Sequence, residues 1–221
     1  MTPELPGYGE ALDRDAPDRI EEFADYVLGY LDELGVGNFK LVGHSMGGMV
    51  VQEMAARAPE RIDRLVLYGT GPVGLLPGRF ETIAESKRRA LEEGVEATAR
   101  RTVATWFRNG EKAPMFDLCM ELGGKVAIQA VLAGLSAMEA WDGRSALKGI
   151  SMPTLVLWGD GDRTYLWSQP KALWQGIAGA ELAVVPGCAH NVHLEKPFIF
   201  NALLDDFLCR ESSDKALSNK G

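Results

Sequence analysis

The sequence predicts an α/β fold, in which a mostly parallel sheet of about four strands is flanked by helices and interrupted once by a helical insertion. Four short apolar runs have the length and composition of buried strands, and segments with helical spacing lie between them. Strands that alternate with helices form parallel sheets, so all four are expected to run in one direction. The strands are predicted at residues 39–44, 62–68, 153–158 and 181–186.

The helices are predicted from apolar spacing and from residues that start and stop helices. Asp15 and Pro17 suit the start of a first helix, and Gly35 suits its end. Between them, apolar residues recur at three- and four-residue spacing, which is typical of a helix with one buried face. Further helices are predicted at residues 49–57, 171–177 and 197–208.

The segment from residue 75 to residue 147 differs in character from the rest of the chain. A stretch rich in Gly and Pro at residues 69–78 marks its start, and its helical composition interrupts the alternation of strands and helices. We therefore predict a core made of residues 1–74 and 148–210, with residues 75–147 as a helical cap. Residues 211–221 are polar and are predicted to form a disordered tail.

The most informative motif is Gly-His-Ser-Met-Gly-Gly at residues 43–48, between a predicted strand and a predicted helix. A Gly-x-Ser-x-Gly motif in that context predicts a nucleophile elbow, a strained turn with Ser45 at its apex. Gly43 and Gly47 leave room for the turn, and Gly47 is expected to let the helix pack close to the sheet. The backbone amide of Met46 is expected to stabilise an oxyanion.

Partners for Ser45 follow later in the chain. Asp160 and Asp162 follow the predicted strand at residues 153–158, and His190 follows the next strand. The carboxyl ends of parallel strands meet at one edge of the sheet, so these side chains are expected near Ser45. A histidine can take the proton of a serine hydroxyl, and a carboxylate can hold the histidine ring in the correct tautomer. The order Ser, Asp, His therefore predicts a catalytic triad.

Four segments together resemble the α/β-hydrolase superfamily, namely residues 41–48, 59–67, 153–162 and 187–197. The resemblance implies a partial α/β-hydrolase fold with a helical cap over the site. It also implies Ser45 as the nucleophile and His190 as the base. The family places its acid three residues after the glycine that stands here as Gly159, which selects Asp162 and leaves Asp160 as a turn residue.

The start of the chain also resembles the family. Residues 5–9, Leu-Pro-Gly-Tyr-Gly, are similar to the loop after the family's fourth strand, so the chain is expected to be an N-terminally truncated member. The family's His-Gly-rich turn, which donates the second amide of the oxyanion hole, does not occur in the sequence. The strand at residues 39–44 is then expected at the sheet edge, where only Lys40 is charged. Such an apolar edge predicts self-association.

Three further side chains are candidates for substrate binding. His44 adjoins Ser45 but also suits packing, and His193 lies three residues after His190, where it also suits support of the catalytic turn. Trp106 lies in the helical insertion and suits either an apolar pocket or the packing of helices. The chain has three histidines, which are divided among these roles, so neither a metal site nor a cofactor is predicted.

The predicted function is a serine hydrolase that cleaves a small carboxylic ester or lactone through an acyl-enzyme. Residues 137–144 resemble, though weakly, the enol-lactonase branch of the superfamily. Two alternatives stay open, a carbon–carbon bond hydrolase of ring-cleavage products and an impaired fragment with half an oxyanion hole. The net charge of −8 argues against nucleic acids and anionic membranes as partners. The three cysteines form no even disulfide framework, which favours the cytoplasm.

Overall fold

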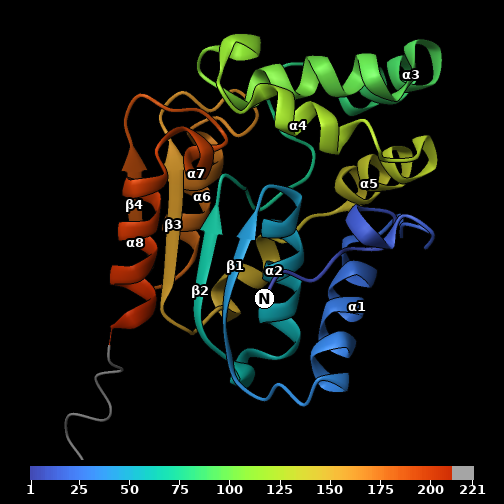
Figure 1. The fold of residues 1–221 in the computed structure, drawn as a ribbon. Coiled ribbons are helices and arrows are strands. Elements are labelled where there is room, and N and C mark those ends of the chain that lie inside the picture. The colour runs from blue at the N-terminus through green and yellow to red at the C-terminus, as the bar shows by residue number, and fades with distance from the viewer. Residues whose placement is uncertain (211–221) are drawn as a thin grey trace, which may run out of the picture.

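The computed structural model describes residues 1–210, and it contains the predicted parallel sheet (Figure 1). The strands are β1 (Phe39–His44), β2 (Ile62–Tyr68), β3 (Thr154–Gly159) and β4 (Glu181–Val185). They pair in parallel in the order β1-β2-β3-β4, so each strand lies beside its neighbour in the chain. The strand predictions are therefore confirmed to within one residue at each end. The predicted tail at residues 211–221 lies outside the described residues.

Helices cover both faces of the sheet (Figure 1). Those of the core are α1 (Ile20–Glu33), α2 (Met46–Arg57), α6 (Ser168–Gly176), α7 (Val192–Glu195) and α8 (Pro197–Cys209). Buried side chains of α1, α2 and α6 share one apolar cluster, whereas α8 contributes Phe207 to another. Short 3-10 helices occur at η1 (Gly9–Ala11), η2 (Pro59–Arg61), η3 (Gly110–Lys112) and η4 (Arg144–Gly149).

The two central strands, β2 and β3, supply both of these clusters. Every residue of β3 is buried, and Asp63 is the one exposed residue of β2. Leu65 and Leu67 face the cluster under α1 and α2, while Val66 and Tyr68 face the cluster under α8. A strand covered on both faces has apolar residues at every position, because successive side chains point to opposite sides. This is why β3 and residues 65–68 of β2 appear as continuous apolar runs.

The first helix begins later than its capping residues suggest. α1 starts at Ile20 with Arg19 as N-cap, and no side chain caps it, so the prediction of Asp15 as the N-cap is wrong. Ile20 and Phe23 are fully buried in the core. Most of the stability of a helix in a protein comes from packing of its apolar face. The start of α1 therefore follows the first residue that reaches the core.

Helices dominate the predicted cap segment. They are α3 (Ile83–Trp106), α4 (Phe116–Gly123) and α5 (Ile128–Ala140), and they lie over the carboxyl ends of the strands (Figure 1). Gly94 breaks α3 with a non-helical conformation at φ 85°. Val103, Phe107 and Phe116 belong to an apolar cluster separate from those of the sheet. The position and helical content agree with a cap, and its definition as a domain of its own stays a prediction.

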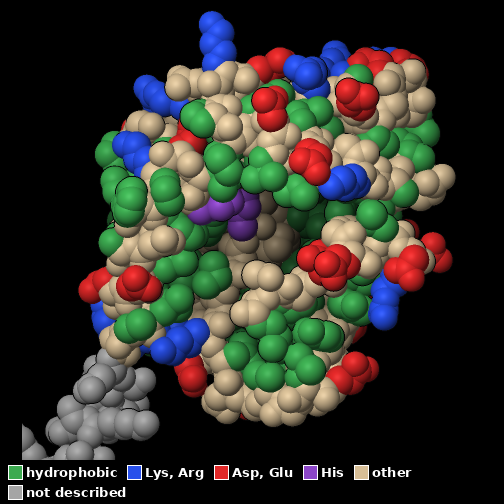
Figure 2. Space-filling view, viewed as in Figure 1, with side chains coloured by type: hydrophobic (Ala, Val, Ile, Leu, Met, Phe, Trp, Pro, Cys, Tyr) green, Lys and Arg blue, Asp and Glu red, His purple; other side chains and the backbone are tan. Residues whose placement is uncertain are grey.

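β1 lies at an edge of the sheet, where β2 is its only partner strand among residues 1–210. Val42 on this strand is 40% exposed. A largely apolar groove of about 660 Å³ runs along β1 and is also lined by α1, α2 and the first residues of the chain. Figure 2 shows this face of the molecule hollowed beside the histidine side chains. The expected edge position of β1 is therefore present.

No single helix among the described residues is both long and apolar enough to cross a membrane. Of the helix pairs within residues 1–210, only α4 and α5 together reach the required length and hydropathy, and the two helices meet at an angle of 102°.

Candidate active site

Ser45 occupies the turn between β1 and α2 in a strained conformation. Its backbone has φ 55° and ψ −122°, and among residues 1–210 it is the one non-glycine residue with positive φ. The Ser45 amide donates to the carbonyl of Tyr68 at 3.1 Å, and Thr70 Oγ1 donates to the Ser45 carbonyl at 2.8 Å. Strained residues of this kind persist where the surrounding structure holds them, and they are concentrated at functional sites.

The glycines of the elbow divide their roles differently from the expectation. A Cβ at Gly43 would lie 2.5 Å from the Gly47 carbonyl oxygen, so Gly43 is needed for the close turn. A Cβ at Gly47 would meet nothing within 4 Å, whereas one at Gly48 would lie 2.4 Å from Thr70. The expectation that Gly47 allows close packing of helix on sheet is wrong, and Gly48 instead allows α2 to pack against Thr70, in the loop after β2. The rotation of α2 about its axis decides which glycine faces Thr70.

Asp162 and His190 form a buried pair beyond the ends of β3 and β4. Asp162 is 4% exposed and His190 is 1% exposed. His190 Nδ1 lies 2.8 Å from Asp162 Oδ2. Because a carboxylate only accepts hydrogen bonds, we assign the proton to Nδ1, which leaves Nε2 free to accept one. Asp162 Oδ1 accepts from the amides of Thr164 and Tyr165 at 2.8 and 3.0 Å, so both carboxylate oxygens are held.

The competing carboxylate, Asp160, has another environment. Its Oδ1 accepts from the amide of Gly187 at 2.8 Å, and its side chain is 40% exposed near Arg108. It therefore ties together the two loops that carry Asp162 and His190, as expected of a turn residue. His190 pairs with Asp162, which is the partner that the family spacing selects.

The Ser45 hydroxyl and the His190 ring make no hydrogen bond in the described part of the chain. Such bonds are often long in a site without substrate and tighten when substrate binds. Ser45, Asp162 and His190 nevertheless follow β1, β3 and β4 respectively, all at the carboxyl edge of the sheet. This edge is where open α/β sheets carry their sites.

Tyr165 is a site residue that sequence reasoning missed. It is fully buried, and its ring stacks on His190 with the centroids 5.5 Å apart and the planes inclined by 12°. Burial raises the pKa of the Tyr165 phenol, and contacts with Ser45 and Thr70 lower it in part. Its hydroxyl makes no hydrogen bond of sound geometry within residues 1–210. A buried phenol thus lies beside both the serine and the histidine.

His44 and His193 pack behind the His190 loop. The His44 ring stacks on Tyr68 and lies 4.4 Å from the His190 ring, with its Nε2 3.2 Å from the His190 carbonyl oxygen. Tyr68 Oη donates to the same carbonyl at 2.7 Å and lies 3.0 Å from His193 Nδ1. Burial lowers the pKa of both His44 and His193, and the charge of His190 lowers them further.

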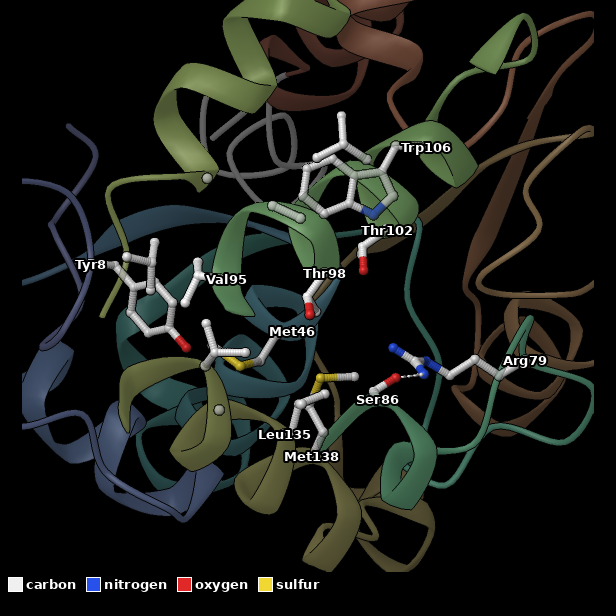
Figure 3. Close-up of a pocket in the computed structure, with 16 residues that line it drawn as sticks. Tyr8, Met46, Arg79, Ser86, Val95, Thr98, Thr102, Trp106, Leu135 and Met138 are labelled. Carbon is white, nitrogen blue, oxygen red and sulfur yellow. Dashed lines mark hydrogen bonds between the residues drawn. The ribbon is translucent and has the colours of Figure 1, made fainter. Parts of the chain in front are cut away.

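A mainly apolar cavity of about 210 Å³ lies between α2 and the cap helices (Figure 3). Met46, the residue after Ser45, forms part of its wall, and so do Leu135 and Met138 of α5. Trp106 also lines it, with its ring centroid 6.2 Å from that of His190. Trp106 also packs against the apolar cluster that holds Val103 and Phe116, so both of its predicted roles fit, whereas His44 and His193 lie outside the lining of this cavity.

The backbone amide of Met46 is suited to bind an oxyanion. Met46 is the first residue of α2, and the first amides of a helix have no acceptor within it. The positive end of the helix dipole adds to their attraction for a negative oxygen. Across the described residues, no group of three or more His, Cys, Asp or Glu side chains is arranged to hold a metal ion.

Comparison with known proteins places this arrangement in a family. Residues 1–197 match a family model described as the alpha/beta hydrolase fold. The chain belongs to this family. A 2-hydroxy-6-oxononadienedioate/2-hydroxy-6-oxononatrienedioate hydrolase of Pseudomonas sp. is 28% identical over 223 residues, which cover 93% of this chain and 75% of that protein. A 2-hydroxy-6-oxo-6-phenylhexa-2,4-dienoate hydrolase of Comamonas testosteroni is 32% identical over 196 residues, 82% of this chain and 66% of that protein.

Solved structures agree with this assignment. The enol-lactonase from Burkholderia xenovorans superposes with a TM-score of 0.85 and 28% sequence identity, over 93% of this chain and 79% of that one. The proteins named here are hydrolases or a lactonase, so hydrolysis is the chemistry that these likenesses support. In this α/β hydrolase, Tyr165 lies beside the catalytic pair without a motif in the sequence. Tyr165 lies three residues after Asp162, which is the one signal that could have found it.

Proposed function

We propose that this α/β hydrolase cleaves a small carboxylic ester or lactone through an acyl-enzyme on Ser45. One observation carries the proposal: the strained serine at the elbow shares the carboxyl edge of the sheet with the buried pair of Asp162 and His190, 2.8 Å apart. A nucleophile, a base held in one tautomer and an amide at a helix start are the parts that acyl transfer requires.

The reaction would proceed in two halves. His190 Nε2 takes the proton of the Ser45 hydroxyl as Oγ attacks the carbonyl carbon, and the Met46 amide binds the resulting oxyanion. Collapse of this intermediate breaks the carbon–oxygen bond, and His190 returns the proton to the leaving alcohol. Water, deprotonated by His190, then attacks the acyl-enzyme and releases the carboxylic acid. Asp162 stabilises the imidazolium in both halves.

The cavity supports a small acyl group. Its volume of about 210 Å³ is below the range of about 300–1,000 Å³ that is usual for drug-sized ligands. The predicted cap, residues 75–147, provides most of its lining, so we propose that this segment covers the substrate. We also propose a cytoplasmic location, as the content of three cysteines predicts.

A second candidate is hydrolysis of a carbon–carbon bond in a ring-cleavage product. The two curated relatives named above favour it, because their names describe hydrolases of 2-hydroxy-6-oxo acids. The same Ser45 and His190 would serve either reaction. Rates on 4-nitrophenyl esters, on γ-lactones and on 2-hydroxy-6-oxo-6-phenylhexa-2,4-dienoate decide between the two candidates.

The first test concerns the nucleophile. A fluorophosphonate probe should label the wild-type chain covalently, and Ser45→Ala should abolish both labelling and ester hydrolysis. Ser168→Ala is the matched control, because Ser168 is exposed at the start of α6. The control should label at the wild-type rate. Undiminished labelling of a folded Ser45→Ala protein would refute the assignment.

A further inference from the structure

Arg79 is the one charged side chain among the residues that line the cavity. In Figure 3 its guanidinium extends toward the cavity interior and meets Ser86, while apolar side chains occupy the opposite side. Thr98 and Thr102 lie near it on the same wall. The cavity is therefore polar at one end only, and that end carries a positive charge.

The hydrogen bonds of Arg79 leave part of its guanidinium unused. Nη1 donates to the carbonyl oxygen of Glu81 at 2.8 Å and to Ser86 Oγ at 2.9 Å. The Nε atom is buried and has no partner within residues 1–210. Phe80 lies against the guanidinium, 4.5 Å from its carbon atom to the ring centroid. The group is thus fixed in place with donors to spare.

The Glu81 carboxylate offsets part of the cost of burying Arg79, because its charge raises the pKa of Arg79, but it makes no ion pair with the guanidinium. Glu81 Oε1 accepts from Ser86 Oγ at 2.6 Å, and its Oε2 lies 3.7 Å from Nε of Arg89. Among the described residues no carboxylate comes within ion-pair distance, 4.0 Å, of the Arg79 guanidinium. Burial also lowers the pKa of Arg79 from its ordinary value, which reflects the cost of keeping the cation away from water.

Arg79 is half-buried, and its buried Nε lacks a partner among the described residues, so a bound anion would supply the acceptor that this donor lacks. The planar guanidinium matches a carboxylate through two parallel hydrogen bonds. A single arginine in an otherwise apolar cavity suits one negative charge rather than the two of a phosphate monoester. We propose that Arg79 binds a carboxylate of the substrate, which is therefore an ester or lactone that carries a separate acidic group.

The position of Arg79 fits a substrate that spans the cavity. Met46, the residue after Ser45, and Arg79 both line the cavity, so a molecule that fills it contacts the residue next to the nucleophile and also the guanidinium. This inference rests on the proposed hydrolase function, because it names the substrate class of the same site.

The kinetic test uses two esters of similar size. Mono-4-nitrophenyl glutarate carries the carboxylate, and 4-nitrophenyl pentanoate has a methyl group in its place. We expect wild type to favour the acidic ester in kcat/KM by about tenfold or more, as for a hydrogen bond to a charged group. Arg79→Gln should reduce this ratio to about one, and Arg79→Lys should restore part of it. Arg88→Gln, at a half-exposed position of α3, is the control and should keep the ratio.

A binding test separates this inference from the proposed function. Glutarate is titrated by calorimetry into Ser45→Ala and into Ser45→Ala with Arg79→Gln, after circular dichroism shows both folded. The dissociation constant should rise by about tenfold or more in the double variant. If Arg79→Gln does not fold, Arg79→Lys takes its place in the Ser45→Ala background. Weaker glutarate binding by this variant than by the protein that keeps Arg79 supports the site. If glutarate binding depends on Arg79 but the wild-type protein hydrolyses no ester, the hydrolase proposal is refuted and the carboxylate site is retained. Equal glutarate affinity in both proteins, or no acidic preference in wild type, would overturn the inference.

Discussion

Asp160 and Asp162 are two carboxylates in one turn whose surroundings differ. Asp162 is buried against His190, whereas Asp160 is 40% exposed and bonded to the amide of Gly187. Asp162→Asn should lower the rate of ester hydrolysis by about 10⁴-fold, because an amide no longer holds the Nδ1 proton of His190. Asp160→Asn keeps an acceptor for Gly187 and should leave the rate close to that of wild type.

Steady-state kinetics of both variants measure this difference. Protein folding is checked by circular dichroism, because Asp162 also accepts the amides of Thr164 and Tyr165. If the Asp160 variant lost more activity than the Asp162 variant, the acid of the triad would be misassigned.

At the scale of elements, the elbow depends on how closely α2 approaches the loop after β2. Gly48→Ala places a Cβ 2.4 Å from Thr70, whose hydroxyl supports the Ser45 carbonyl. We expect this variant to lose about 1–3 kcal/mol of stability, as is usual for overpacking, and to lose activity because Ser45 moves. Gly47→Ala meets no neighbouring atom and should be neutral or gain up to about 1 kcal/mol from helix propensity.

Urea unfolding measures the free energy of unfolding of both variants. Gly47→Ala serves as the matched control, because it is the same substitution at the adjacent position. Equal stability of Gly47→Ala and Gly48→Ala would show that the approach of α2 to the loop after β2 does not depend on Gly48. A larger loss at Gly47 would restore the role that the motif alone indicates.

For the whole molecule, the open edge of β1 is the feature with the largest consequence. Its amides and carbonyls on one side have no partner strand among residues 1–210, and Val42 is 40% exposed beside an apolar groove. An apolar sheet edge of this kind is prone to pair with another strand. We expect residues 1–221 to self-associate through β1, with a second copy adding its own β1 to the sheet.

Light scattering across a range of concentrations measures this association. Val42→Lys should shift the protein toward monomer, because a charged side chain at a sheet edge opposes pairing. Val184→Lys is the control on β4, where Val184 is 45% exposed, and it should associate like wild type. A wild-type protein that stays monomeric at all concentrations and unfolds cooperatively would contradict the prediction.

The sequence by itself determined the strands, the elbow and the acid–base pair. These features are local: β3 is buried on both faces and therefore apolar throughout, and the elbow needs its glycines within one turn. The order of Ser45, Asp162 and His190 was visible because each follows a strand, and parallel strands end at a common edge.

Only the tertiary structure decided which glycine meets Thr70, where α1 begins, and which side chains surround the catalytic pair. Gly48, Ile20, Tyr165 and Arg79 have their roles through contacts with residues far away in the chain, and no local pattern records such contacts. Arg79 looks in sequence like any surface arginine. Its significance comes from the packing that places it, half-buried, in the cavity wall without an ion-pair partner among the described residues.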